Sequence, residues 1–189
     1  MKESFRLDEA VEVLRQGGTI LYPTDTVWGI GCDATNEQAV NKVFAVKQRV
    51  GGKSLIVLVD SIETLKNYVE DIPEMAFDLM ESITDPLTII YPGARNLAPN
   101  VPARDGSVGI RIPNDPLCQQ LVRALGKPLT STSANLSGSP NPVSFSKISP
   151  EIRRAVDFIV PDYQARVRMA RPSTIIRIGK DGTMEIIRN

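Results

Sequence analysis

The sequence predicts an α/β domain whose twisted sheet mixes parallel and antiparallel strands and is flanked by helices. Apolar strand-like segments alternate with amphipathic helical patterns along most of the chain. Strand patterns then dominate the C-terminal part, where the connections are too short for parallel crossovers. The length of 189 residues favours one domain, which we expect to cover residues 1–189.

Capping residues mark the expected helix starts. Asp8 is expected to cap the first helix, and Thr35 with Gln38 has the spacing of a capping box for the second. Asp115 and Ser149 each precede a proline, a pattern typical of helix starts. Two shorter helices are expected at 61–69 and 73–81.

Eight short apolar segments, several of them rich in β-branched residues, are typical of strands. They span residues 19–22, 54–59, 86–91, 107–112, 127–130, 157–160, 173–178 and 184–188. Lys180, Asp181 and Gly182 separate the last two segments and fit a hairpin turn.

The composition excludes several kinds of site. The chain has no histidine, which rules out Ser-His-Asp and Cys-His catalysis and histidine metal ligands. Lys and Arg together number 22, as do Asp and Glu together, and this zero net charge argues against a general polyanion binder. Cys32 and Cys118 match no metal or redox spacing and are expected to be reduced packing residues. Without a membrane-spanning run or a signal-peptide core, the protein is expected to be cytoplasmic, with no membrane partner.

Two polar segments follow predicted strands. Residues 131–138 read Ser-Thr-Ser-Ala-Asn-Leu-Ser-Gly and could present several hydrogen-bond donors to one oxyanion-rich ligand, although a polar turn leading to a helix cap explains them equally well. Thr24, Asp25 and Thr26 follow the strand at 19–22, where ligands bind in open α/β sheets. The alternative for this segment is a proline turn beside a buried Trp28.

Arg111 is the most restrictive cation, because it lies inside an apolar strand. An unpaired buried charge costs several kcal/mol or more, so Arg111 needs either a structural carboxylate or a ligand. Lys47, Arg49 and Lys53 follow the second helix and suit phosphate or carboxylate, although a solvated face also explains them.

A third group of cations, Arg166, Arg168 and Arg171, lies in one predicted loop. It suits phosphates or an RNA backbone, or it is simply solvated.

Four motifs in this order resemble those of the YrdC-like family of threonylcarbamoyl-AMP synthases, in its short single-domain form. They are Pro-Thr-Asp-Thr (23–26), Lys-x-Arg (47–49), Val-Gly-Ile-Arg-Ile-Pro (108–113) and Ser-Thr-Ser-Ala-Asn-x-Ser-Gly (131–138). The resemblance covers nearly the whole chain and implies a sheet around a large concave cleft. It also implies a nucleotidyltransferase that forms threonylcarbamoyl-adenylate and pyrophosphate from L-threonine, bicarbonate or CO2, and ATP with Mg²⁺. Downstream proteins would then use the adenylate for t6A modification of tRNA.

The resemblance assigns roles by position. The implied catalytic residues are Lys47, Arg49, Ser133 and Asn135. The implied threonine-binding residues are Thr26, Arg111, Ser131 and Thr174. The implied ATP-binding residues are Arg49, Lys53, Ser107, Ser133, Asn141 and Arg188. No side chain of the protein is expected to bind a metal ion.

The chain departs from the family pattern at a few positions. Val50 and Ser54 stand where the family often has proline, and Leu58 lies near a position at which longer members have a histidine. Two alternatives stay open. One is a non-catalytic RNA-binding or ribosome-assembly module, which the local cations support and the zero net charge opposes. The other is a paralogue with a different substrate, although such paralogues tend to lose the Lys-x-Arg and Ser-x-Asn residues that this chain has.

Overall fold

The computed structural model describes residues 2–48, 54–142, 144–161 and 171–189. The strands in these ranges are β1 (Ile20–Tyr22), β2 (Gly29–Gly31), β3 (Ile56–Leu58), β4 (Leu87–Tyr91), β5 (Val108–Arg111), β6 (Leu129–Ser133), β7 (Phe158–Ile159), β8 (Thr174–Ile178) and β9 (Met184–Arg188). The helices are α1 (Lys2–Arg15), α2 (Glu37–Val46), α3 (Ile62–Leu65), α4 (Glu74–Ser82), α5 (Pro116–Leu125) and α6 (Pro150–Ala155), with a 3-10 turn, η1, at Phe145–Lys147.

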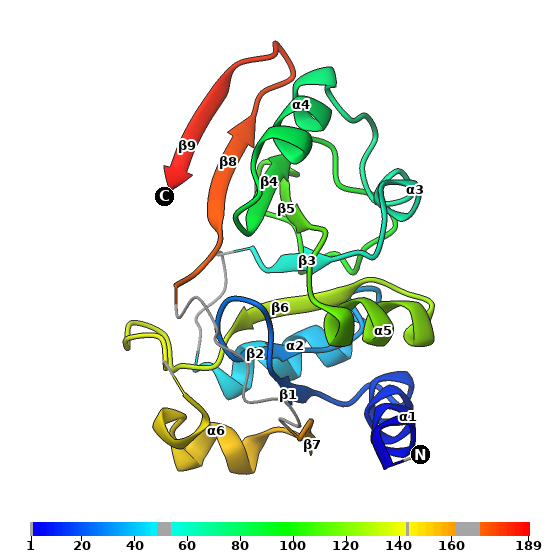
Figure 1. Cartoon of the computed structure of the whole chain (residues 1–189), viewed down its shortest axis with the longest axis vertical. Helices are drawn as coiled ribbons and strands as arrows, with labels where there is room; N and C mark the ends of the chain where they lie inside the picture. Colours follow the sequence, from blue (N-terminus) through cyan, green and yellow to red (C-terminus); the bar gives the residue numbers. More distant parts are fainter. Residues whose placement is uncertain (1, 49–53, 143, 162–170) are drawn as a thin grey trace.

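The strands form one mixed sheet in the order β7-β1-β2-β6-β3-β5-β4-β8-β9. The pairs β1–β7, β3–β5 and β4–β8 are parallel, and the other neighbouring pairs are antiparallel. Figure 1 shows β1, β2 and β6 in the lower part of the view and β4, β5, β8 and β9 in the upper part. The predicted α/β class with a mixed sheet is therefore confirmed.

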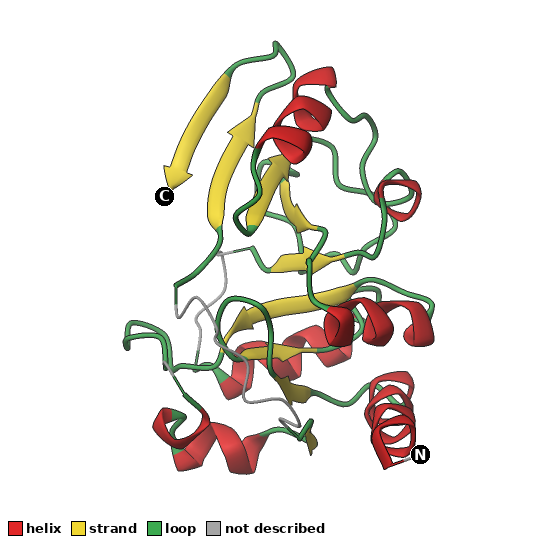
Figure 2. Cartoon of the chain, viewed as in Figure 1, coloured by secondary structure: helices red, strands yellow, loops and turns green. Residues whose placement is uncertain are grey.

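Side-chain alternation along β1 connects two hydrophobic cores. Ile20 and Tyr22 pack in the core that includes residues of α1 and α5, while Leu21 packs in the core that includes residues of α2. In Figure 2, α1 and α5 lie beside each other at one end of the lower strands. Burial on both faces explains why these strands read as continuous apolar runs. None of the helices in the described ranges is long and apolar enough to cross a membrane.

Two predicted helix caps are confirmed. The Asp115 side chain accepts a hydrogen bond from the Cys118 backbone N–H at the start of α5 (2.9 Å), and the Ser149 hydroxyl accepts one from Ile152 at the start of α6 (3.3 Å). Each cap precedes a proline that suits the first helical turn because its missing N–H is not needed there.

The other two predicted caps are wrong. Helix α1 already begins at Lys2, so Asp8 lies within it. Helix α2 is capped by Asn36, whose side chain accepts from the Ala39 N–H (3.1 Å). The Thr35 hydroxyl instead donates to the Asp33 carboxylate (2.6 Å). This charged acceptor two residues away explains why Thr35 does not cap the helix.

The strand predicted at 127–130 continues as β6 to Ser133, so the first part of the polar run is strand rather than turn. Ser131 pairs with Ile56 of β3, and Ser133 pairs with Gly29 of β2. Strand β2 itself was not predicted, because its sequence Gly-Ile-Gly lacks a strand pattern. A Cβ on Gly31 would lie 2.3 Å from the Thr130 carbonyl oxygen, so the close approach of the two backbones requires glycine there.

The remaining predictions differ only at their ends. The hairpin between β8 and β9 is confirmed, with Gly182 at a positive φ of 79°. The helix expected at 61–69 is limited to α3, and the strand expected at 54–59 to β3. Cys32 and Cys118 are free and buried, as expected.

Candidate functional site

Two cavities lie on opposite faces of β4 and β5. Gly109 and Arg111 line the smaller cavity, of about 360 Å³, whereas Ile110 and Ile112 line the larger one, of about 770 Å³. Side chains alternate between the faces of a strand, so neighbouring residues reach different cavities. Among the described residues, the charged side chains that line the smaller cavity are Lys47, Arg111 and Arg188, and we call it the cationic cavity. Those that line the larger one are Asp25, Glu81, Asp85 and Asp115, and we call it the acidic cavity.

Arg111 lines the cationic cavity and is 7% exposed. Its Nη2 donates to the Asp25 carboxylate, and its Nη1 donates to the Thr26 hydroxyl (3.2 Å). Of the two partners that the sequence allowed for Arg111, a structural carboxylate is therefore present, and it is Asp25. A guanidinium carries five N–H donors, so further donors remain for an anionic ligand.

Lys47 lies at the C-terminal end of α2 and is only 3% exposed. Its ammonium donates to the backbone carbonyls of Ser133 and Asn135 (2.9 Å for the latter) and to the Asn135 side-chain oxygen (3.2 Å). That oxygen also accepts from the Ser133 hydroxyl (2.5 Å). Lys47 therefore holds the segment after β6 in place and brings a positive charge to the cavity wall.

Arg188 approaches the cavity from β9. Its Nε and Nη2 donate to the Ser173 backbone carbonyl (3.0 and 2.8 Å). Burial lowers the pKa of Arg188, and the positive charge of Arg111 lowers it further. Two guanidiniums that repel each other across one cavity favour the binding of an anion between them.

The structure brings most of the predicted site residues together. Those that line the cationic cavity are Thr26, Lys47, Arg111, Ser131, Ser133, Asn135, Asn141 and Arg188. Arg49 and Lys53 lie outside the described residues, as do Arg166 and Arg168. The Arg171 side chain forms an ion pair with Asp85 (2.6 Å).

Thr174 and Ser107 are not among the described residues that line the cationic cavity. Ser173, directly before β8, and Ile175 within it line the cavity, so Thr174 between them faces away. The Thr174 hydroxyl lies 3.5 Å from the Asn189 side chain. The Ser107 hydroxyl is held by the Asp105 carboxylate (2.6 Å).

The sequence placed Asp25 after a strand end, where a ligand would be expected, but did not identify it as the partner of Arg111. That pairing could have been considered, because a buried arginine in an apolar strand needs a carboxylate or a ligand. Ser173 had no functional signal in the sequence, because only the direction of its side chain in the folded protein distinguishes it from Thr174.

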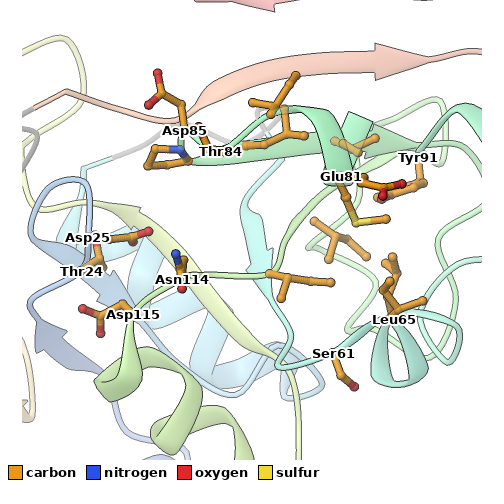
Figure 3. A pocket seen from close by; sticks show the side chains of 18 residues that line it. Thr24, Asp25, Ser61, Leu65, Glu81, Thr84, Asp85, Tyr91, Asn114 and Asp115 are labelled. Atoms are coloured by element: carbon orange, nitrogen blue, oxygen red, sulfur yellow. The ribbon is translucent and has the colours of Figure 1, made fainter. Parts of the chain in front are cut away.

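The acidic cavity, shown in Figure 3, combines carboxylates with a largely apolar lining. Asp25 and Asp115 lie together on one side of the view, with Glu81 and Tyr91 on the other. Burial raises the pKa of Tyr91 above its ordinary value. Four carboxylates would repel a phosphate or a carboxylate ligand, so the larger cavity is the poorer site for an anion.

The cationic cavity combines positive charge with hydroxyl and amide groups. This arrangement can bind an oxyanion and stabilise charge that develops on it. None of the described residues that line it is a carboxylate or a cysteine. Its cations, hydroxyls and amides suit the positioning and electrostatic stabilisation of an anionic ligand.

Comparison with known proteins places these residues in a family. The family model Sua5_yciO_yrdC, described as "Telomere recombination", matches residues 12–189. A protein of Pseudoalteromonas translucida named threonylcarbamoyl-AMP synthase is 34% identical over 165 residues, which are 86% of this chain and 88% of that protein. One of the same name from Xanthomonas euvesicatoria is 35% identical over 187 residues, which are 94% of this chain and all of the relative.

Solved structures agree with the sequence comparisons. P. abyssi Sua5 complexed with L-threonine superposes with a TM-score of 0.83 at 28% identity, over 91% of this chain and 50% of the Sua5 chain. This chain therefore spans about half of that longer protein. E. coli YciO superposes with a TM-score of 0.82 at 28% identity, over 97% of this chain and 88% of YciO. The chain belongs to the Sua5/YciO/YrdC family.

Proposed function

We propose that this protein is a threonylcarbamoyl-AMP synthase. It joins L-threonine, CO2 or bicarbonate, and ATP into threonylcarbamoyl-adenylate and releases pyrophosphate. The observation that carries the proposal is the cationic cavity, in which residues of all four motifs come together. Relatives that bear this name match almost the whole length of the chain.

Threonine binds at the Arg111 end of the cavity in this proposal. The guanidinium takes the α-carboxylate in a bidentate contact, because its planar fork matches a carboxylate. Asp25 holds the guanidinium from behind, and Thr26 and Ser131 line the same end of the cavity. An arginine held by a carboxylate loses less side-chain entropy when the ligand arrives.

The nucleotide phosphates bind at the Lys47 end. Lys47 keeps Ser133 and Asn135 in position and contributes positive charge, and Arg188 adds a second cation across the cavity. Arg49 and Lys53 lie outside the described residues, and we assign them to the phosphate site because the family resemblance gives them that role.

The reaction needs no protein nucleophile. The threonine nitrogen forms an N–C bond with CO2 and loses a proton, which gives a carbamate. A carbamate oxygen then forms a bond to the α-phosphorus of ATP, while the bond from that phosphorus to the bridging oxygen breaks and pyrophosphate leaves. Holding the reactants together contributes up to roughly 7–11 kcal/mol in favourable cases, and the cations stabilise the charge on the phosphates.

Mg²⁺ belongs to this proposal as a companion of ATP. No described carboxylate lines the cationic cavity, and the described residues contain no cluster of three or more metal-ligating side chains. The ATP phosphates would therefore supply its main ligands, with hydroxyl and amide oxygens such as those of Ser133 and Asn135 nearby. When bound, the ion neutralises phosphate charge.

The product is an activated carbamoyl donor, so a later enzyme has to transfer its threonylcarbamoyl group. We assign that role to the proteins that form t6A on tRNA. The synthase itself needs no RNA contact for the step described above.

The test is pyrophosphate release from ATP, Mg²⁺ and bicarbonate, measured with and without L-threonine. We expect release only when threonine is present. Release without threonine, or none from a folded protein, contradicts the proposal. If the protein were instead an RNA-binding module, it would show salt-sensitive RNA affinity that survives the substitution Ser133→Ala.

A further inference from the structure

Thr24 has no role in the proposed function, yet its side chain is almost fully buried beside the threonine end of the site. It is 5% exposed, and its hydroxyl makes three short contacts. It donates to the Val27 backbone carbonyl (2.7 Å) and accepts from the Thr26 backbone N–H (3.0 Å). The third contact is with the Thr26 hydroxyl (2.8 Å).

The direction of the third hydrogen bond follows from counting hydrogens. A threonine hydroxyl has one hydrogen and two lone pairs. The hydrogen of Thr24 is committed to the Val27 carbonyl, because two oxygens 2.7 Å apart need a hydrogen between them. Thr24 therefore accepts from Thr26, and the Thr26 hydroxyl must donate its only hydrogen away from the cavity.

The same count applies to Thr26. Its oxygen donates to Thr24 and accepts from Arg111 Nη1 (3.2 Å), which leaves one lone pair. Thr26 lines the cationic cavity, so this lone pair is available to a ligand there. A ligand atom in this position must be a hydrogen-bond donor.

We infer that Thr24 is a positioning residue that turns Thr26 into an obligatory acceptor for the amino group of the threonine substrate. The inference deepens the proposed function and rests on it. Arg111 presents only donors, which suit the carboxylate, and Thr26 beside it presents only an acceptor, which suits the nitrogen. An α-amino acid carries both groups on one carbon, so this adjacent pair recognises its zwitterionic end.

The arrangement also suits the chemistry. The threonine nitrogen keeps at least one N–H as an ammonium, as an amine and as a carbamate. An acceptor at Thr26 can therefore hold the nitrogen throughout carbamate formation. A hydroxyl free to rotate would present its hydrogen to the nitrogen lone pair and compete with its attack on CO2.

The test combines two variants of Thr24 with two ligands. Thr24→Val removes the hydroxyl at nearly constant shape, and Thr24→Ser keeps it. The ligands are L-threonine and 3-hydroxybutyrate, which retains the carboxylate and the hydroxyl but lacks the amino group. We expect Thr24→Val to weaken the binding of L-threonine about 10-fold, because one buried hydrogen bond to its amino group is lost. The affinity for 3-hydroxybutyrate and the KM for ATP should not change. Thr24→Ser should bind L-threonine within about 2-fold of wild type.

Thr130→Val is the matched control. Thr130 is also a buried threonine whose hydroxyl accepts from a backbone N–H, that of Cys32 (2.9 Å), but it does not line the cationic cavity. Thr130→Val should lower the melting temperature about as much as Thr24→Val does, without changing the affinity for L-threonine. The inference would be overturned if Thr24→Val and Thr130→Val lost the same affinity for L-threonine. It would also be overturned if Thr24→Val lost the same affinity for L-threonine and for 3-hydroxybutyrate.

Failure of the synthase function and failure of the role of Thr24 give different binding results. If wild-type protein does not bind L-threonine, the proposed function is wrong. If wild-type protein binds it and folded Thr24→Val binds it equally well, only the role of Thr24 is wrong. If Thr24→Val does not fold, inhibition of the wild-type protein is measured instead. The inhibitors are 3-hydroxybutyrate and an L-amino acid that competes with the substrate, such as L-serine. Equal inhibition constants would contradict an acceptor at Thr26 that requires an amino group.

Discussion

The cationic and acidic cavities share the strands β4 and β5 but differ in the sign of every described charged residue that lines them. The larger cavity is the acidic one, so volume alone would select the cavity whose charges suit an anionic substrate less well. Asp25 connects the two, because it lines the acidic cavity and its carboxylate binds Arg111 of the cationic cavity. Charge rather than volume therefore distinguishes the proposed substrate cavity, and Asp25 of the acidic cavity holds Arg111 of the cationic one in place.

The largest effect is expected from Arg111→Met. This change removes the proposed carboxylate partner of threonine and leaves the half-buried Asp25 carboxylate without its cation. We expect threonine-dependent pyrophosphate release to fall at least about 100-fold and the free energy of unfolding to fall by about 2–4 kcal/mol, measured by denaturant titration.

Arg171→Met is its control on the acidic side, because the ion pair of Arg171 with Asp85 is exposed. It should change the stability by at most about 1 kcal/mol and leave the activity unchanged. Similar losses in both variants would show that the two cavities do not differ in function.

A smaller effect is expected from Asp25→Asn. The amide still reaches Arg111, but the charge that orients the guanidinium is lost, so the KM for threonine should rise about 10-fold with little change in the KM for ATP. Asp85→Asn alters another carboxylate of the acidic cavity without touching Arg111 and should leave both KM values unchanged. An equal rise in both KM values for Asp25→Asn would refute a role specific to threonine.

Lys47→Met is expected to act mainly on the nucleotide end. It removes the ammonium that binds Ser133 and Asn135, and should lower the free energy of unfolding by about 1–3 kcal/mol and raise the KM for ATP. Lys42 lies on the same helix and donates to the Gly17 carbonyl (2.8 Å), away from both cavities. Lys42→Met should lower the free energy of unfolding by at most about 1 kcal/mol and leave the KM for ATP unchanged. If Lys42→Met raised the KM for ATP as much as Lys47→Met, the assignment of Lys47 to the nucleotide end would be contradicted.

The smallest effect is expected from the two thiols, which line neither cavity. Burial raises the pKa of Cys32 to about 12 and that of Cys118 well above its ordinary value. Both thiols are therefore protonated at pH 8, and alkylation by iodoacetamide should be slow in the folded protein and fast in denaturant. Saturating threonine should not alter the slow rate. Rapid labelling of the native protein would show that the thiols are accessible.

The sequence by itself determined the α/β class, the β8–β9 hairpin and the caps of α5 and α6. These features depend on short-range patterns: strand alternation, a turn of suitable residues, and an N-cap followed by proline. Its motifs also identified the residues that meet in the cationic cavity, including Thr26, Arg111 and Ser133.

Only the tertiary structure decided which residue partners which. Asp25 and Arg111 are 86 positions apart, and their ion pair exists because the segment after β1 reaches the end of β5. Strand pairing extended β6 to Ser133, and side-chain alternation at the start of β8 directs Ser173 rather than Thr174 toward the cavity. Local patterns carry no information on which strands become neighbours or which face is filled. Those choices are made by packing and hydrogen bonding across the whole sheet, which also determine where the hydrogen of Thr26 points.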